Sequence, residues 1–250
     1  MTVPGRWTGS VYFSDRVFAY VGAVATTGLH AHHATQVAIA LDGTMLELGD
    51  RTELSVEARG FVVPADAHHA ICQPTRALLL YVEPESDLGG ALESVVERSG
   101  VEAWKAAAST LPALDVGEDI DLRAVVEQLR GYLVSPIGGR DFHPAVQAAI
   151  DALPALVEHG EVRVGRIAKQ VGLSESRFMH LFREQVGIPL RPYARWLRLR
   201  LAANALRRAA SLTEAAHAAG FTDSAHFSNV FHETFGLPPS ALVKTVTWVE

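Results

Sequence analysis

Short apolar runs alternate with turn residues over roughly the first eighty positions. Val, Leu and aromatic residues fill the runs at 11–13, 17–24, 36–41, 44–48, 61–63 and 77–82, and Gly, Asp or Pro separates most of them. Short strands at this spacing predict an antiparallel β sandwich or barrel.

From about residue 87 the apolar positions take up helical spacing. Residues 91–109 and 121–134 each predict a helix, and Asp121 is a candidate N-cap of the second. The stretch 135–141 contains one Pro and two Gly and is a candidate linker, after which the pattern stays helical. The predicted fold is multidomain: an all-β domain over 1–86, a helical linker and dimerisation segment over 87–140, and an all-α domain over 141–250.

The C-terminal part contains an internal repeat, because 164–190 resembles 212–240. Each copy has a small residue, a glycine four positions later, a capping Ser or Asp, and two phenylalanines four apart. The matched pairs are Ala168/Ala216, Gly172/Gly220, Ser174/Asp223, Phe178/Phe227, Phe182/Phe231, Gly187/Gly236 and Pro189/Pro238. A glycine at a sharp corner followed by a capped amphipathic helix predicts a helix-turn-helix, used twice.

Charge supports a polyanionic partner for this part. The net charge of the chain is −6, but residues 160–210 hold 11 basic residues and only three acidic ones. An Arg-rich predicted helix over 191–211 joins the two repeats. A basic segment beside an acidic body is typical of a nucleic-acid binder with a separate sensing domain, although solvated Arg-rich helices are the alternative.

Residues 144–243 resemble the DNA-binding domain of the AraC (arabinose-regulator) family of bacterial transcription factors. The resemblance rests on the two repeats and on three motifs, which are Tyr193, Arg198 and Leu199; Gly220, Phe221, Asp223 and Phe227; and Phe235, Gly236 and Pro239. It implies a sequence-specific regulator that binds double-stranded DNA. A helical bundle without nucleic acid would explain the buried phenylalanines but not the duplicated glycines and caps.

The resemblance also implies which side chains meet DNA. Ser176, Met179 and His180 on the first recognition helix, and Ala225, Ser228 and Asn229 on the second, are expected to face bases. Asn229 suits an adenine edge and Met179 a thymine methyl group. Arg177, Arg183, Arg195 and Arg198 are expected to contact phosphates.

Two histidine clusters mark the N-terminal domain. His30, His32 and Gln36 precede Gly43, and Pro64 and Asp66 precede His68 and His69. This arrangement resembles the cupin (double-stranded β-helix) signature, with Gln36 in place of its Glu and Asp66 in place of its Gly. The resemblance implies a site for a small-molecule or metal effector.

His30, His32 and His69, with Gln36 as a weak neutral ligand, suit one divalent transition metal, Zn, Fe, Ni or Cu. The alternative is that these side chains hydrogen-bond a polar effector or one another. His33 and His68 are expected on the opposite faces of their strands, at solvent or at an interface.

Three functions remain open on the sequence. A regulator whose cupin domain senses an effector is favoured over a metal-dependent cupin oxygenase or isomerase fused to a DNA-binding module, because no further paired carboxylates accompany the histidines. A purely architectural DNA binder would need no effector pocket. We expect no catalytic residues, a homodimer formed by the 87–140 helices, no membrane partner and, from the single Cys72, a cytoplasmic protein.

Overall fold

The computed structural model describes residues 6–14, 16–114, 116, 120–134, 141–208 and 210–249. The chain forms two compact units. Residues 1–140 together with 231–250 form one, the β unit, and Asp141–Val230 form the other, the helical unit. The candidate linker 135–141 lies outside the described residues except for Asp141.

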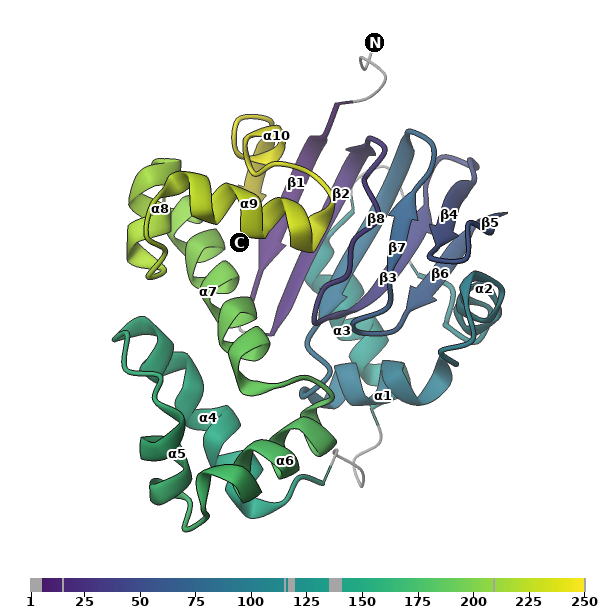
Figure 1. Cartoon of the computed structure of the whole chain (residues 1–250). Helices are drawn as coiled ribbons and strands as arrows, with labels where there is room; N and C mark the ends of the chain where they lie inside the picture. The colour runs from purple at the N-terminus through teal and green to yellow at the C-terminus, as the bar shows by residue number, and fades with distance from the viewer. Residues whose placement is uncertain are drawn as a thin grey trace. The chain divides into compact units, whose positions relative to one another are not determined.

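The β unit is built on two sheets (Figure 1). The six-stranded sheet has the order β6 (Gly60–Val63), β3 (Thr35–Ala40), β8 (Thr75–Val82), β2 (Val17–Val24), β1 (Thr8–Phe13) and β9 (Val246–Val249). The three-stranded sheet has the order β5 (Ser55–Ala58), β4 (Leu46–Asp50) and β7 (His69–Ile71). All neighbours are antiparallel except β1 and β9, which are parallel.

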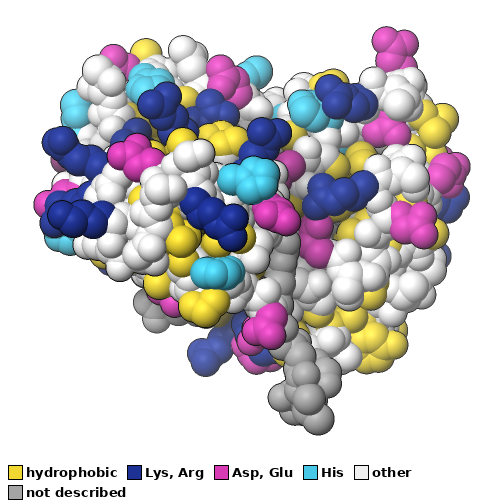
Figure 2. Space-filling model, turned by 60° about the horizontal axis from the view of Figure 1, so that its bottom comes forward, with side chains coloured by type: hydrophobic (Ala, Val, Ile, Leu, Met, Phe, Trp, Pro, Cys, Tyr) yellow, Lys and Arg dark blue, Asp and Glu magenta, His cyan; other side chains and the backbone are white. Residues whose placement is uncertain are grey.

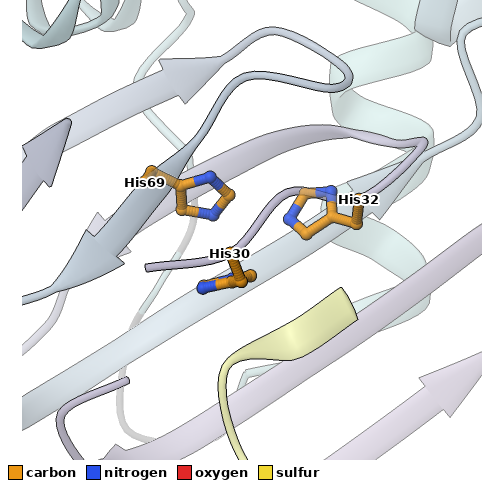
Figure 3. Close-up of side chains that lie close together, drawn as sticks. All are labelled: His30, His32 and His69. Atoms are coloured by element: carbon orange, nitrogen blue, oxygen red, sulfur yellow. The ribbon is translucent and has the colours of Figure 1, made fainter. Parts of the chain in front are cut away.

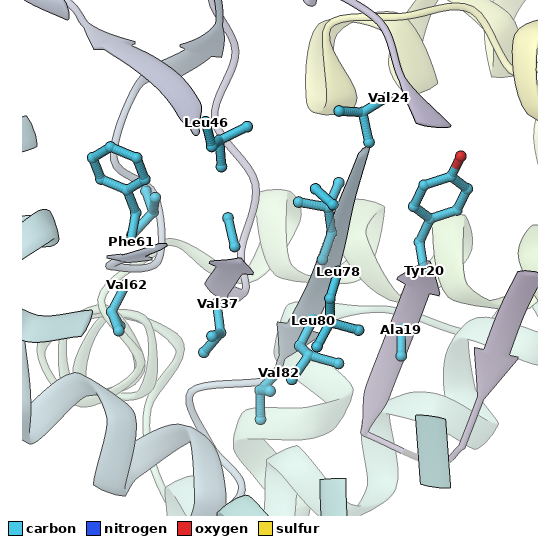
Figure 4. Packing of buried hydrophobic residues seen from close by; sticks show 14 of the residues in the cluster. Ala19, Tyr20, Val24, Val37, Leu46, Phe61, Val62, Leu78, Leu80 and Val82 are labelled. Atoms are coloured by element: carbon cyan, nitrogen blue, oxygen red, sulfur yellow. The ribbon is translucent and has the colours of Figure 1, made fainter. Parts of the chain in front are cut away.

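Aliphatic and aromatic side chains from both sheets form the core of this unit (Figure 4). Val37, Leu78, Leu80 and Phe61 are completely buried there, as the dense apolar runs in β3, β6 and β8 predict. Asp42 and Gly43 both have positive φ between β3 and β4, the conformation that a two-residue turn of type I′ requires. The expected all-β N-terminal region is therefore present.

Three helices follow the strands and belong to the same unit: α1 (Asp87–Val95), α2 (Val101–Ala108) and α3 (Leu122–Leu133). The expected helix over 91–109 is two helices, because Val96 is extended and ends α1, and Gly100, with φ 118°, lies just before the start of α2. Asp121 caps α3 as predicted, accepting hydrogen bonds from the amides of Arg123 and Ala124. The apolar face of α3 contacts β1, β2 and α1, so the β unit of the same chain covers it.

The C-terminal region is helical, as expected. The helices of the helical unit are α4 (Pro144–Glu158), α5 (Val164–Gln170), α6 (Glu175–Val186), α7 (Leu190–Arg207), α8 (Leu212–Ala218) and the first part of α9 (Ser224–Phe235). None of the helices among the described residues is long and apolar enough to cross a lipid bilayer.

The predicted domain over 141–250 does not coincide with one compact unit. Phe231–Glu250, which include the end of α9, α10 (Ser240–Val243) and β9, belong to the β unit. The reason is that β9 pairs with β1 over Gly9–Tyr12, while Phe231, Phe235, Leu242 and Trp248 pack against its core. Periodicity does not predict this strand, because 246–249 is short and follows a helical pattern.

Candidate functional site

The helices α5 and α6 meet at a tight corner. Ala168 is buried where the two helices approach, and its carbonyl accepts a hydrogen bond from the amide of Leu173. Gly172 has φ 73°, a conformation that favours glycine, and Ser174 caps α6 by accepting from the amide of Arg177. Phe178 and Phe182 are completely buried, so α6 uses one face for packing and leaves the other for solvent.

The helices α8 and α9 repeat that corner. Ala216 is buried, and its carbonyl accepts from the amide of Phe221, as Ala168 does from Leu173. Gly220 has φ 72°, and the carboxylate of Asp223 accepts from the amide of His226 at 2.7 Å. The internal repeat of the sequence therefore corresponds to two helix pairs with the same turn conformation and the same kind of cap.

The side chains expected to face bases lie away from the buried faces of α6 and α9. Five of the six are exposed, namely Ser176, Met179, His180, Ala225 and Asn229. Ser228 is half-buried, and its hydroxyl donates to the carbonyl of Ser224 at 2.7 Å. Met179 exposes 47% of its surface, so its side chain is accessible on that face.

The four arginines expected to contact phosphates divide into two groups. Arg177, Arg183 and Arg195 are exposed, and Lys and Arg side chains gather over the helical unit on the face shown in Figure 2. Arg198 is half-buried, and its Nε lies near Gly220 at the second corner. Part of the Arg198 side chain is therefore packed at the second corner.

The structure brings together the three histidines expected to hold a metal or effector (Figure 3). His30 and His69 pair through two backbone hydrogen bonds, and His32 lies just before β3. All three are buried, and one ring nitrogen of each lies within 4.8 Å of the others. Among the described residues this is the one group of histidine, cysteine or acidic side chains with such spacing.

Backbone carbonyls fix the orientation of the three rings. Nδ1 of His30 lies 2.8 Å from the carbonyl of Gly28, Nδ1 of His32 lies 3.0 Å from that of Ala34, and Nδ1 of His69 lies 2.9 Å from that of Ala67. A carbonyl only accepts, so each Nδ1 carries the proton and each Nε2 presents a lone pair. This is the orientation that metal-ligating histidines take from their second contacts.

Burial keeps these imidazoles neutral. Burial, reinforced by the neighbouring His32, lowers the pKa of His30 to about 3. Burial also lowers the pKa of His32, and burial followed by the charges of His30 and His32 holds the pKa of His69 well below its usual range. Neutral imidazole is the form that binds a metal ion.

Two polar atoms in the cluster suit a cation. Nε2 of His69 is buried and has no hydrogen-bond partner among the residues that the structure describes. Nε2 of His32 lies 3.1 Å from Oε1 of Gln36, which places two acceptors side by side unless the amide rotates to offer its NH₂ group. A positive ion shared by His30, His32, His69 and Gln36 would accept the lone pairs of Nε2 of His69, Nε2 of His32 and Oε1 of Gln36. The donor set therefore fits a transition metal.

Sequence reasoning missed the aromatic residues that enclose the histidines. The ring of Phe235 lies 6.1 Å from that of His32 and 6.0 Å from that of Tyr81, which itself lies 5.0 Å from His32. Gly236 is so close that a Cβ there would lie 2.7 Å from Nδ1 of His30. Phe235 and Gly236 were visible in the sequence only as part of the second repeat.

His33 corrects one expectation, because it lies neither at solvent nor at an interface. It is buried between Asp66 and Glu85, with Nδ1 3.0 Å from Asp66 and Nε2 2.7 Å from Glu85. Burial alone would lower the pKa of His33, but the hydrogen bonds and charges of the two carboxylates raise it to about 10. Asp66 has φ 63°, so it keeps the backbone of the expected glycine while adding a carboxylate. His68 is exposed, as predicted.

Comparison with known proteins places the C-terminal part in a family. Residues 167–245 match the model of a helix-turn-helix domain. A transcriptional regulator of Rhizobium meliloti, GlxA, is 35% identical over 101 residues, which are 40% of this chain and 31% of that protein. Residues 167–245 therefore form a helix-turn-helix domain.

The similarity to curated relatives at the sequence level covers only part of the chain. The transcriptional activator RhaS of Pectobacterium atrosepticum is 31% identical over 131 residues, which are 52% of this chain and 46% of that protein. The chain thus spans less than half the length of these curated relatives. Similarity of fold extends further, because an apo structure of a ToxT variant from Vibrio cholerae gives a TM-score of 0.60 at 12% identity, over 94% of this chain and 99% of ToxT.

Proposed function

We propose that this chain is a sequence-specific transcriptional regulator that binds double-stranded DNA through two helix-turn-helix units, α5–α6 and α8–α9. The observation that carries the proposal is the pair of corners with the same glycine conformation, each leading to a capped helix with an exposed face. The curated relatives support it, since GlxA and RhaS are transcriptional regulators and not enzymes.

Within this proposal the exposed faces of α6 and α9 read bases. Ser176, Met179 and His180 act from α6, and Ala225, Ser228 and Asn229 from α9. Arg177, Arg183 and Arg195 bind phosphates, which fixes the register of the helices without sequence preference. For Arg198 a phosphate contact has to come from the terminal Nη1 and Nη2 groups of the guanidinium, because Nε is buried.

The β unit acts as a cupin-type sensor domain in this account. The two sheets and the histidine cluster inside them support that assignment. ToxT has been solved with a bound unsaturated fatty acid and with a bound naphthalenyl butenoic acid, so that protein takes small molecules. We infer that this chain also responds to a small effector or a metal.

His30, His32 and His69 would hold a divalent transition metal such as Zn, Fe, Ni or Cu, with Gln36 as a fourth, neutral ligand. When bound, the metal would crosslink β7 to the loop before β3, without chemistry of its own. Metal analysis of untagged protein tests this. About one metal per chain, absent in His69→Ala and kept in His68→Ala, is expected; less than about a tenth of a metal per chain contradicts a resident metal.

A homodimer remains part of the proposal, because paired half-sites on DNA mirror a two-fold axis. The apolar stripes of α1, α2 and α3 lie in the core of the β unit, so a dimer contact through these helices would use their outer faces. A monomeric mass at micromolar concentration, with and without DNA, would contradict the dimer.

Selection of bound sequences from a random pool of duplex DNA tests the proposed function. A regulator enriches one sequence, whereas a helical bundle without a DNA function enriches none. An architectural binder retains DNA without enrichment, and its affinity is indifferent to metals and metabolites. Turnover of a small molecule by the metal-loaded protein would favour the enzyme instead.

A further inference from the structure

The end of the second recognition helix takes part in two structures at once. α9 runs unbroken from Ser224 to Phe235, and the boundary between the two units falls inside it, after Val230. Asn229 lies on the part that belongs to the helical unit, and Phe235 lies on the part that belongs to the β unit. Six residues of helix, about 9 Å, separate them.

Residues beyond Val230 enclose the histidine cluster. Phe235 contacts His32 and Tyr81, and the carbonyl of Gly236 accepts a hydrogen bond from the amide of Gly28 at 3.0 Å. Gly236 has φ 70°, and a Cβ on it would lie 2.6 Å from the carbonyl oxygen of Gly28 and 2.7 Å from Nδ1 of His30. The fit is therefore tight enough that a single methyl group disturbs it.

This part of the enclosure joins the β unit at the edge of a sheet, whereas the other parts lie within it. Tyr81 lies on β8, which pairs with both β2 and β3, and Trp104 lies in α2 beside β6. By contrast, β9 lies at the end of the six-stranded sheet and, among the described strands, pairs with β1 alone, over four residues. Because the histidines are at most 5% exposed, a ligand that enters has to displace part of the enclosure. Detaching 231–249 breaks the four-residue pairing of β9 with β1 and the backbone hydrogen bonds Gly28–Gly236 and Gly9–Thr245, but it leaves the other strands of both sheets paired.

We infer that residues 231–249 form a detachable cover of the histidine site, and that this cover couples the site to the DNA-reading helix α9. The inference rests on the proposed function for the role of α9. A ligand at the histidines and a duplex at α9 both act on the cover, because Phe235 cannot move without moving Asn229 or breaking the helix. If the ligand at the histidines binds the covered and uncovered states with different affinities, its binding changes the affinity of the chain for DNA. By the same argument, bound DNA changes the affinity for that ligand.

Carbethoxylation of histidines by diethyl pyrocarbonate, followed by mass spectrometry of the full chain, tests the cover without knowledge of the effector. The variant is Gly236→Ala. Its control is Gly187→Ala, the matching position after α6, where φ is 95° and a Cβ would meet nothing within 4 Å. Both variants place a Cβ at a positive φ, but only the Cβ of Gly236→Ala would lie against the histidine site.

We expect His30, His32 and His69 to react at least tenfold faster in Gly236→Ala than in Gly187→Ala, while exposed His68 reacts alike in both. Phe235→Ala, which adds no backbone strain, should also raise the reactivity of the three histidines. Equal reactivity of the three histidines in Gly236→Ala and Gly187→Ala overturns the cover.

A separate measurement tests the coupling between the histidine site and α9. Saturating the wild type with a selected duplex is expected to change the reactivity of the three histidines at least threefold, and an unchanged reactivity overturns the coupling. If no duplex is selected, the proposed function and the coupling fail together, whereas the comparison of Gly236→Ala with Gly187→Ala still decides whether the cover exists.

Discussion

At the scale of single residues, small changes of chemistry set what each site can bind. Gln36 replaces the carboxylate of the cupin pattern with a neutral amide, so the four candidate ligands carry no net charge when the imidazoles are neutral. Asp66 keeps the backbone conformation of the glycine it replaces and gives a carboxylate to His33. Neither consequence follows from the pattern of residue types alone, because both depend on which side chains meet in three dimensions.

Asn229 offers a direct test of base reading. Asn229→Ala is expected to weaken binding to the selected duplex by about 1–3 kcal/mol and to relax preference at one base pair, because the amide can make a bidentate contact with adenine. Gln147→Ala, which removes an exposed amide from α4, is the control. Unchanged selectivity in Asn229→Ala removes this residue from the reading set.

The buried His33 predicts a specific pH dependence. Its pKa is raised from about 6.5 in the unfolded chain to about 10, so its contribution to stability is complete below pH 6.5 and is lost as the pH rises towards 10. Urea unfolding should therefore show a steeper loss of stability between pH 6 and pH 10 in the wild type than in His33→Gln. The exposed His159→Gln serves as the control, and parallel profiles for the wild type and His33→Gln would contradict the account.

At the scale of elements, periodicity predicted the main helices and strands but not the breaks and edges. The six apolar runs all became strands, and Asp121 caps α3 as expected. One predicted helix is two, because Val96 takes an extended conformation after α1 and Gly100, with φ 118°, precedes α2. The short strands β5, β7 and β9 carry too few residues to show alternation, and tertiary pairing alone stabilises them.

A substitution in α3 tests whether this helix packs in the core of the β unit or against a second subunit. Leu129 is fully buried against the β unit, so Leu129→Ala is expected to lower the free energy of unfolding by about 2–5 kcal/mol. Because the covering surface belongs to the same chain, this decrease should not depend on protein concentration. A Tm difference that grows on dilution would show instead that α3 packs against a second subunit.

At the scale of the whole molecule, each candidate site could be proposed from the sequence, but the connection between the two could not. The histidine cluster could be proposed from the spacing of His30, His32 and His69, and the DNA-facing helices from the repeat. The coupling that we infer between them could not be proposed from the sequence, because it depends on β9 pairing with β1 and on Phe235 lying beside His32. The sequence assigned Phe235 to one domain, whereas the structure places it in the unit of the other.

The exposed arginines predict how binding depends on salt. Alanine at Arg177, Arg183 or Arg195 is expected to reduce the slope of log affinity against log salt by about one for each phosphate that is no longer neutralised, with little change in sequence preference. Arg76→Ala, in the β unit, should leave the slope unchanged. A slope equal to that of the wild type in all three variants would show that these arginines do not bind phosphates.

The most direct test of the central claim is the affinity of the full chain for the selected duplex relative to a scrambled duplex of the same composition, measured at one fixed salt concentration. Two units that read bases predict a ratio of about 10³ or more. A ratio near one, with both duplexes bound equally or not at all, would contradict the account that this chain reads a DNA sequence.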